Sequence, residues 1–173
     1  MRLTTRTNLA LRTLMVCAVN GERIVRKADV AEAINASENH LAQVINKLGQ
    51  TGFITTLRGR HGGFTLALPP QEISVGAVFR SFEADVPFIE CFSETNTCPL
   101  KPACRMGDHL ARAVEAFYAT LDPLTLHDLV DCNTGLETLL SLDAQARMGD
   151  RMRCLRVQAA MSDQAAVAPA KAG

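Results

Sequence analysis

The chain has 173 residues, of which 47% are hydrophobic and 21% charged, and its formal net charge at pH 7 is zero. This length allows one full core with a smaller extension, and no run approaches the roughly 20 apolar residues of a membrane span. The zero net charge hides a division, because residues 1–70 carry nine Lys/Arg against four Asp/Glu, whereas residues 71–173 carry nine against fourteen. The modest basic excess in the first part slightly favours a nucleic-acid partner.

The chain begins with a predicted amphipathic helix over residues 5–20, which an Asn-Gly pair ends. Asn8 and Arg12 interrupt its apolar residues, and no small-residue cleavage motif follows. We therefore interpret the segment as a folded helix and not as a signal peptide, and we expect a cytoplasmic protein. Cys17 lies in the apolar stretch and is expected in the core.

A short helix over residues 26–35 ("RKADVAEAIN") and a longer one over residues 38–50 are predicted next. Ser37 suits the N-cap of the longer helix, because its hydroxyl can accept an orphan backbone N–H, and Glu38 places negative charge at the positive end of the helix dipole. Gly52 ends this helix. Its face opposite the apolar stripe is polar and carries Asn39, His40, Gln43, Asn46, Lys47 and Gln50.

A β-hairpin is predicted from the runs "FITTL" (53–57) and "FTLAL" (64–68), which are rich in β-branched and aromatic residues. The connecting "RGRHGG" makes the tip basic, and we expect its three glycines to supply the positive φ angles of the turn. After two prolines, residues 74–82 resume helical spacing.

This order of elements is typical of a winged helix-turn-helix domain, which we assign to residues 1–83 of a mainly α fold with a small β hairpin. Its third helix enters the major groove, where amides offer base edges a donor and an acceptor together, and its hairpin, the wing, follows the DNA backbone or minor groove. The alternative is a merely solvated helix face and an ordinary loop. The expected DNA-binding residues are Asn39, His40, Gln43, Asn46, Lys47, Arg58, Arg60 and His61.

Three cysteines, Cys91, Cys98 and Cys104, lie in a predicted loop over residues 84–104. In a reducing compartment, clustered cysteines more often bind metal or react than form disulfides. Zinc sites usually contain a Cys-x2-Cys pair, which is missing here, whereas the wider spacing suits an iron-sulfur cluster, [4Fe-4S] or [2Fe-2S]. One coordination position would remain for another ligand, so the site resembles a sensor. The alternatives are a zinc site, a redox thiol pair, or cysteines without a shared role. Cys132 and Cys154 have no neighbours at ligand spacing.

A long helix is predicted beyond the loop, because apolar residues repeat at steps of four, three and four, as in a helix that packs on another helix. This candidate dimerisation seam consists of Leu110, Val114, Phe117 and Leu121. Pro123 ends the helix, and Thr125 with Asp128 forms a capping box for a short following helix, so the region spans residues 105–142. Residues 143–173 show no clear apolar face and are expected to be a poorly ordered tail.

No nucleotide-binding loop or catalytic triad is recognisable, so we do not expect an enzyme. Two other classes of protein remain open, a redox protein that uses the cluster and a metal-stabilised protein-interaction module. A steep salt dependence would distinguish DNA binding from the interaction module.

Four segments resemble the NsrR, IscR and RirA family of iron-sulfur winged-helix repressors: "MRLTTRTNLALRTLM", "RGRHGG", "CPLKPACR" and "AFYATLDPLTLHDLV". The resemblance covers about residues 1–140, and the last two segments are most similar to the nitric-oxide-sensing NsrR branch. It implies a homodimer that binds a palindromic double-stranded operator in its cluster-loaded form and releases it in response to nitric oxide. The competing specificities are iron-responsive, as in RirA, or responsive to cluster status, as in IscR.

The resemblance implies that Cys91, Cys98 and Cys104 ligate the cluster. The NsrR pattern adds an aspartate from the partner subunit near the start of the first helix, but this chain has Asn8, a poorer iron ligand, as RirA-like members also have. Spacing suggests a second candidate for the fourth ligand, because in a helix that begins near residue 105 Asp108 lies one turn beyond Cys104. His109 is less suitable, since it points about 100° further round.

Overall fold

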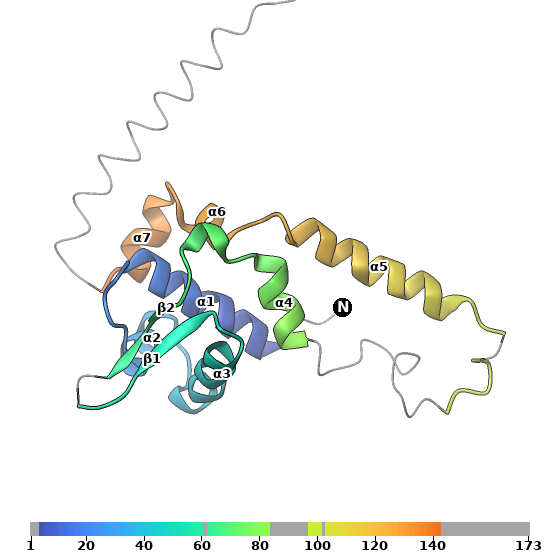
Figure 1. Cartoon of the computed structure of the whole chain (residues 1–173), viewed down its shortest axis with the longest axis horizontal. Helices are drawn as coiled ribbons and strands as arrows, with labels where there is room; N and C mark the ends of the chain where they lie inside the picture. The colour runs from blue at the N-terminus through green and yellow to red at the C-terminus, as the bar shows by residue number, and fades with distance from the viewer. Residues whose placement is uncertain (1–3, 61, 84–96, 102, 143–173) are drawn as a thin grey trace, which may run out of the picture.

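The computed structural model describes residues 4–60, 62–83, 97–101 and 103–142, and within them it is mainly helical with one two-stranded sheet (Figure 1). The mainly α prediction with a small hairpin is confirmed. In chain order the elements are α1 (Thr5–Val19), α2 (Lys27–Ala33), α3 (Glu38–Gln50), β1 (Ile54–Leu57), β2 (Gly63–Leu66), the 3-10 helix η1 (Pro70–Glu72), α4 (Val75–Glu83), α5 (Met106–Leu121), α6 (Leu126–Val130) and α7 (Thr134–Leu140). No helix in the described ranges is long and apolar enough to cross a membrane.

Helix α1 forms the centre of the core, because α3, α4 and α6 all pack against it. Leu14, Val16 and Cys17 are fully buried, which confirms that Cys17 is a core residue. The buried side chains of α1 include two threonines, Thr7 and Thr13, as well as apolar residues. The buried Thr13 hydroxyl donates to the carbonyl of Leu9 at 2.7 Å, which satisfies its polar group inside the core.

Helix α3 has the bounds predicted from the sequence and lays its apolar face on the core. Leu41 and Leu48 are fully buried, which turns the polar face outward. Ser37 is the N-cap residue as expected, but its side chain makes no capping hydrogen bond within the described chain, so the expected hydroxyl cap is wrong. An ion pair joins α2 to α3 instead, with Lys27 Nζ 3.0 Å from Glu38 Oε2.

The wing consists of β1 and β2, which pair antiparallel. Val25 and Phe64 exchange two backbone hydrogen bonds of 2.9 Å, which fasten the wing to the segment after α1. Of the three tip glycines, all within the described residues, only Gly59 has a positive φ, of 112°, so the expectation of three is wrong. Gly63 is required for a different reason, because an added Cβ would lie 2.4 Å from the carbonyl oxygen of Val25.

Helix α5 extends away from the body and is joined to it through α4 (Figure 1). The Phe79 and Phe117 rings meet edge to face with centroids 5.8 Å apart. Arg80 lies 2.7 Å from Glu115 and 3.0 Å from Asp122, and its hydrogen bond lowers the pKa of Glu115. No α5 side chain is fully buried by the described residues.

The short helices α6 and α7 are held by side-chain hydrogen bonds at their ends. The predicted capping box of α6 is confirmed, since Thr125 Oγ1 accepts from the Asp128 N–H and Asp128 accepts from the Thr125 N–H. Helix α7 was not predicted. Asn20, at the end of α1, holds it in place by donating to the Leu140 carbonyl at 3.0 Å and accepting from the Leu142 N–H at 2.9 Å.

Candidate nucleic-acid interface and cysteine segment

The outward face of α3 presents the polar residues expected to contact DNA. Asn39, His40, Gln43 and Asn46 are exposed, and Lys47 is half-buried. Val44, the next residue after Gln43, is nearly fully buried in the core, so the helix backbone beneath these side chains is fixed by packing. The structure therefore places one side of α3 where a duplex could reach it, and the individual contacts remain predictions.

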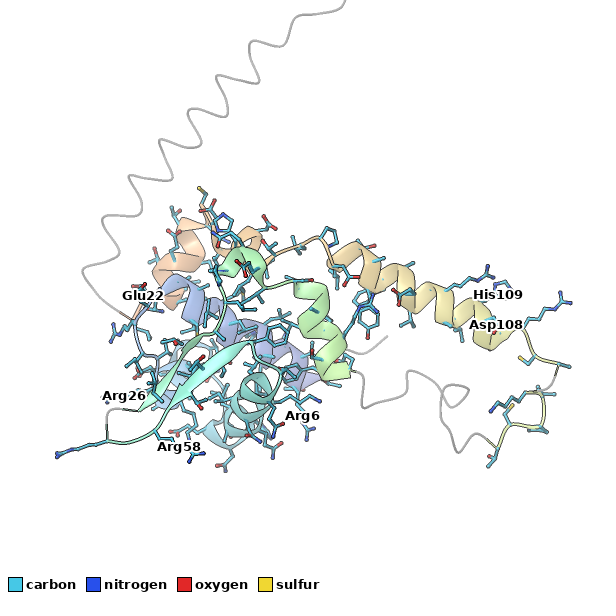
Figure 2. All side chains as sticks on the ribbon, viewed as in Figure 1. Arg6, Glu22, Arg26, Arg58, Asp108 and His109 are labelled. Carbon is cyan, nitrogen blue, oxygen red and sulfur yellow. The ribbon has the colours of Figure 1, made fainter. Side chains whose placement is uncertain are left out.

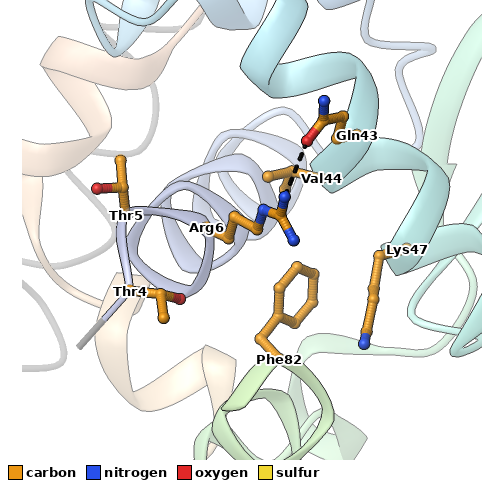
Figure 3. Close-up of a pocket in the computed structure, with 7 residues that line it drawn as sticks. All are labelled: Thr4, Thr5, Arg6, Gln43, Val44, Lys47 and Phe82. Atoms are coloured by element: carbon orange, nitrogen blue, oxygen red, sulfur yellow. Dashed lines mark hydrogen bonds between the residues drawn. The ribbon is translucent and has the colours of Figure 1, made fainter. Parts of the chain in front are cut away.

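A hollow of about 380 Å³ lies between the first turn of α1, the middle of α3 and the end of α4 (Figure 3). Its walls combine two cations with hydroxyls and one aromatic ring. Lys47 Nζ lies 5.9 Å from the centroid of the Phe82 ring, within the range of a cation–π contact. The lining residues are Thr4, Thr5, Arg6, Gln43, Val44, Lys47 and Phe82.

Arg6 is a member of this surface that sequence analysis missed. Its Nη2 donates to Gln43 Oε1 at 3.3 Å, although 37 positions separate the two residues in the chain. The only available signal was a basic residue in the first turn of α1, and a local pattern does not reveal which distant element it meets.

The wing carries two exposed cations, Arg58 and Arg60, as predicted. Figure 2 places Arg58 on the wing and Arg6 beside α3. His61, the third residue expected at the tip, lies outside the described residues.

The cysteine segment is described only in part, since Cys91 lies outside the described residues. Cys98 is half-buried and Cys104 is exposed. Two turns connect them, closed by the Lys101 N–H on the Cys98 carbonyl at 3.2 Å and by the Cys104 N–H on the Leu100 carbonyl at 2.9 Å. No group of three or more potential metal ligands forms among the described residues. Solvent-accessible thiols on turns nevertheless fit the chemistry of iron-sulfur ligation.

Both candidates for the fourth ligand are exposed. Asn8 lies near the start of α1, and Asp108 lies in the first turn of α5, where Figure 2 labels it. Helix α5 begins at Met106, so Cys104 itself precedes the helix. His109 Nδ1 lies 2.8 Å from Arg112 Nη2, and because a guanidinium only donates, Nδ1 accepts in this contact. This contact occupies the lone pair on Nδ1, so Asn8 and Asp108 stay the main candidates and His109 stays the less suitable one.

A carboxylate joins the start of α1 to the end of α4. Glu83 Oε1 accepts hydrogen bonds of 3.0 Å from both the backbone N–H and the hydroxyl of Thr4. It also accepts from the hydroxyl of the fully buried Thr7. Glu83 is the last residue of α4 and directly precedes the cysteine segment in the chain. Its hydrogen bonds therefore connect the start of α1 to the residue at which the cysteine segment begins.

Comparison with known proteins identifies the family. Residues 3–132 match the model of the Rrf2 family, described as "Iron-dependent Transcriptional regulator". The chain belongs to the Rrf2 family. The HTH-type transcriptional regulator NsrR of Geobacillus kaustophilus is 42% identical over 142 residues, which cover 81% of this chain and 97% of that protein. The HTH-type transcriptional repressor NsrR of Streptomyces coelicolor is 43% identical over 137 residues, which cover 78% and 92%.

Among solved structures, CymR, the global cysteine regulator of B. subtilis, is similar with a TM-score of 0.57 and 26% identity, over 75% of this chain and 96% of that one. These findings confirm the winged-helix prediction and the resemblance to NsrR. The Rrf2 chain is a DNA-binding transcriptional repressor and not an enzyme.

Proposed function

We propose that the protein is a homodimeric repressor whose operator binding depends on an iron-sulfur cluster that responds to nitric oxide. The observation that carries this proposal is the identity of about two residues in five with NsrR regulators over most of the chain, together with three cysteines between α4 and α5. In this scheme residues 1–83 bind DNA, residues 84–104 hold the cluster and residues 105–142 dimerise.

DNA binding uses the outward face of α3 in the major groove and the wing on the backbone or minor groove. Gln43 and Asn46 are exposed amides that suit base edges, whereas Arg58 and Arg60 suit phosphates. The basic charge of residues 1–70 supports this assignment. Because such contacts release counterions, operator affinity should fall steeply with salt, and a flat response would favour a protein-interaction module.

The thiolates of Cys91, Cys98 and Cys104 hold the cluster, with Asn8 of the partner subunit or Asp108 in the fourth position. When bound, the cluster supplies iron atoms that react with nitric oxide. The Glu83 contacts support coupling, because they connect the entry of the cysteine segment to α1, on which α3 packs. Gating requires the cluster to interact differently with the DNA-bound and released conformations.

Dimerisation uses α5. Helix α5 extends from the body, and its apolar seam is only half-buried even though Phe117 contacts Phe79 of α4. The seam consists of Leu110, Val114, Phe117 and Leu121. A second copy of α5 would cover this seam, as in other helix pairs.

The deciding experiment is anaerobic purification with iron and sulfide analysis, followed by titration with nitric oxide while absorbance and operator binding are recorded together. We expect the cluster absorbance and operator binding to be lost at the same nitric oxide concentration. Cys98→Ser should abolish operator binding while a helical dimer remains, and Cys132→Ser serves as the matched control with normal behaviour. Operator binding by a cluster-free Cys98→Ser protein would contradict the gating.

Iron-responsive regulation is the second candidate, and Asn8 favours it, since an amide is a weaker iron ligand than a carboxylate. The description of the Rrf2 family model as iron-dependent points the same way. A cluster that ignores nitric oxide but is lost to an iron chelator, together with DNA binding, would select this alternative.

A further inference from the structure

We propose that Arg6 is a positioning residue that orients the amide of Gln43 and thereby sets the base preference of α3. The inference rests on the proposed function, in which the outward face of α3 reads the major groove. Arg6 lies on α1, and it is not among the DNA-binding residues expected from the sequence.

The chemistry of the contact fixes the direction of the amide. Arg6 Nη2 lies 3.3 Å from the Gln43 side chain, and a guanidinium can donate hydrogen bonds but cannot accept them. The atom of Gln43 that faces Arg6 must therefore be its oxygen. The NH2 group then points away from Arg6, as Figure 3 shows.

The surroundings keep Arg6 in place. Its helix turn is anchored by the hydrogen bonds from Thr4 and Thr7 to Glu83, and its guanidinium lies in the hollow that Phe82 also lines. On the other side, the backbone beneath Gln43 is held by the buried side chain of Val44. Both partners of the hydrogen bond therefore project from packed helices, which limits the positions that the amide can adopt.

The orientation changes what Gln43 offers to a base. A free glutamine can accept from adenine N6 and donate to adenine N7 together, which makes adenine its preferred base. With its oxygen engaged by Arg6, Gln43 presents mainly its two N–H donors. Guanine, with acceptors at N7 and O6, then becomes the better match than adenine.

The test begins with a selection of binding sites from randomised duplexes by wild type and by Gln43→Ala. The base pair at which Gln43→Ala loses its preference is the one that Gln43 reads. Four duplexes that differ only at this base pair are then titrated. Wild type, Arg6→Ala, Gln43→Ala and the double variant are compared. Arg60→Ala is the control, because it removes the same charge from the wing. Far-ultraviolet circular dichroism verifies that each variant is folded, as expected for exposed positions.

We expect wild type to prefer guanine at this base pair. Arg6→Ala should shift the guanine-to-adenine affinity ratio toward adenine by about fivefold or more, which is part of the discrimination that a bidentate base contact supplies. In the Gln43→Ala background, Arg6→Ala should leave the ratio unchanged. Arg60→Ala should weaken all four duplexes alike.

Two results would overturn the proposal. Equal weakening of all four duplexes by Arg6→Ala would make Arg6 a phosphate contact only, and an unchanged ratio would show that the hydrogen bond does not orient Gln43. Failure of the underlying function is recognised separately, because wild type would then select no sequence, or Gln43→Ala would alter preference at no position.

Discussion

Replacing Glu83 with alanine should lower the free energy of unfolding by about 2–4 kcal/mol. Glu83 Oε1 accepts three hydrogen bonds, from the N–H and hydroxyl of Thr4 and from the hydroxyl of Thr7. A hydrogen bond to a charged group contributes about 1.5–3 kcal/mol, and a buried polar group left unpaired costs about 1–3 kcal/mol. The three bonds share one oxygen in a half-buried place, so their contributions add to less than their sum.

Two milder variants separate charge from hydrogen bonding. Glu83→Gln keeps an acceptor oxygen but loses the charge, and Thr7→Val keeps the shape but loses the buried hydroxyl. Each should cost about 1 kcal/mol, the typical net value of one hydrogen bond. Because the two side chains are in contact, the double variant should lose less than the two single losses together, with a coupling of about 0.5 kcal/mol or more.

The assay is urea unfolding followed by far-ultraviolet circular dichroism. Glu22→Ala removes an exposed carboxylate from the loop after α1 and should stay within about 0.5 kcal/mol of wild type. A Glu83→Ala protein as stable as the Glu22→Ala control would refute the assigned strength of this anchor. Additive losses for Glu83→Gln and Thr7→Val would show that the two side chains do not act together.

Three further predictions address the core and the caps. Burial raises the pKa of the Cys17 thiol to about 12, so at pH 8 it should resist iodoacetamide in the native protein and react after unfolding. Mass spectrometry of the cluster-free protein checks this, with the exposed Cys104 as the reactive comparison. Leu14→Ala should cost about 2–5 kcal/mol in urea unfolding, because Leu14 is fully buried, and a cost below 1 kcal/mol would contradict its core position. Hydrogen bonds from Thr125 lower the pKa of Asp128, so its contribution to stability is complete above its ordinary pKa and is lost as the pH falls through the lower folded value. The melting-temperature difference between wild type and Asp128→Asn should therefore be constant from pH 8 to 5 and shrink below about pH 4, and a full difference at pH 2 would contradict the assignment.

Local signals predicted most of the fold. The bounds of α3 followed from its apolar period, from Ser37 at the N-cap position and from Gly52 after the helix, where φ is +79°, although the Ser37 side chain makes no capping hydrogen bond. The capping box of α6 was readable because both partners, Thr125 and Asp128, lie within one turn. Such features depend on residues three or four positions apart, a distance over which sequence pattern and structure correspond directly.

Contacts between distant residues were not predictable in the same way. Helix α7 has only seven residues, too few for a clear period, and depends on Asn20 at the end of α1. The hydrogen bond between Arg6 and Gln43 joins positions 37 residues apart. The hydrogen bonds of Glu83 join it to residues 76 and 79 positions away. A polar residue on a predicted helix looks the same whether it faces solvent or meets such a partner, so the candidate interface was predicted on α3 and the wing but not on α1.

The first turn of α1 brings three separate features within five positions of one another. Thr4 and Thr7 bind Glu83 at the entry of the cysteine segment, Arg6 binds Gln43 on α3, and Asn8 is a candidate cluster ligand. Beyond this turn, Leu14, Val16 and Cys17 of α1 are fully buried in the core, so the turn cannot shift freely without disturbing close packing. Under the proposed gating, a change at the cysteine segment would therefore reach the side-chain amide of Gln43 through the first turn of α1. The two variants separate these roles, because Glu83→Ala removes the anchor without touching α3, whereas Arg6→Ala removes the contact with α3 and leaves the anchor intact.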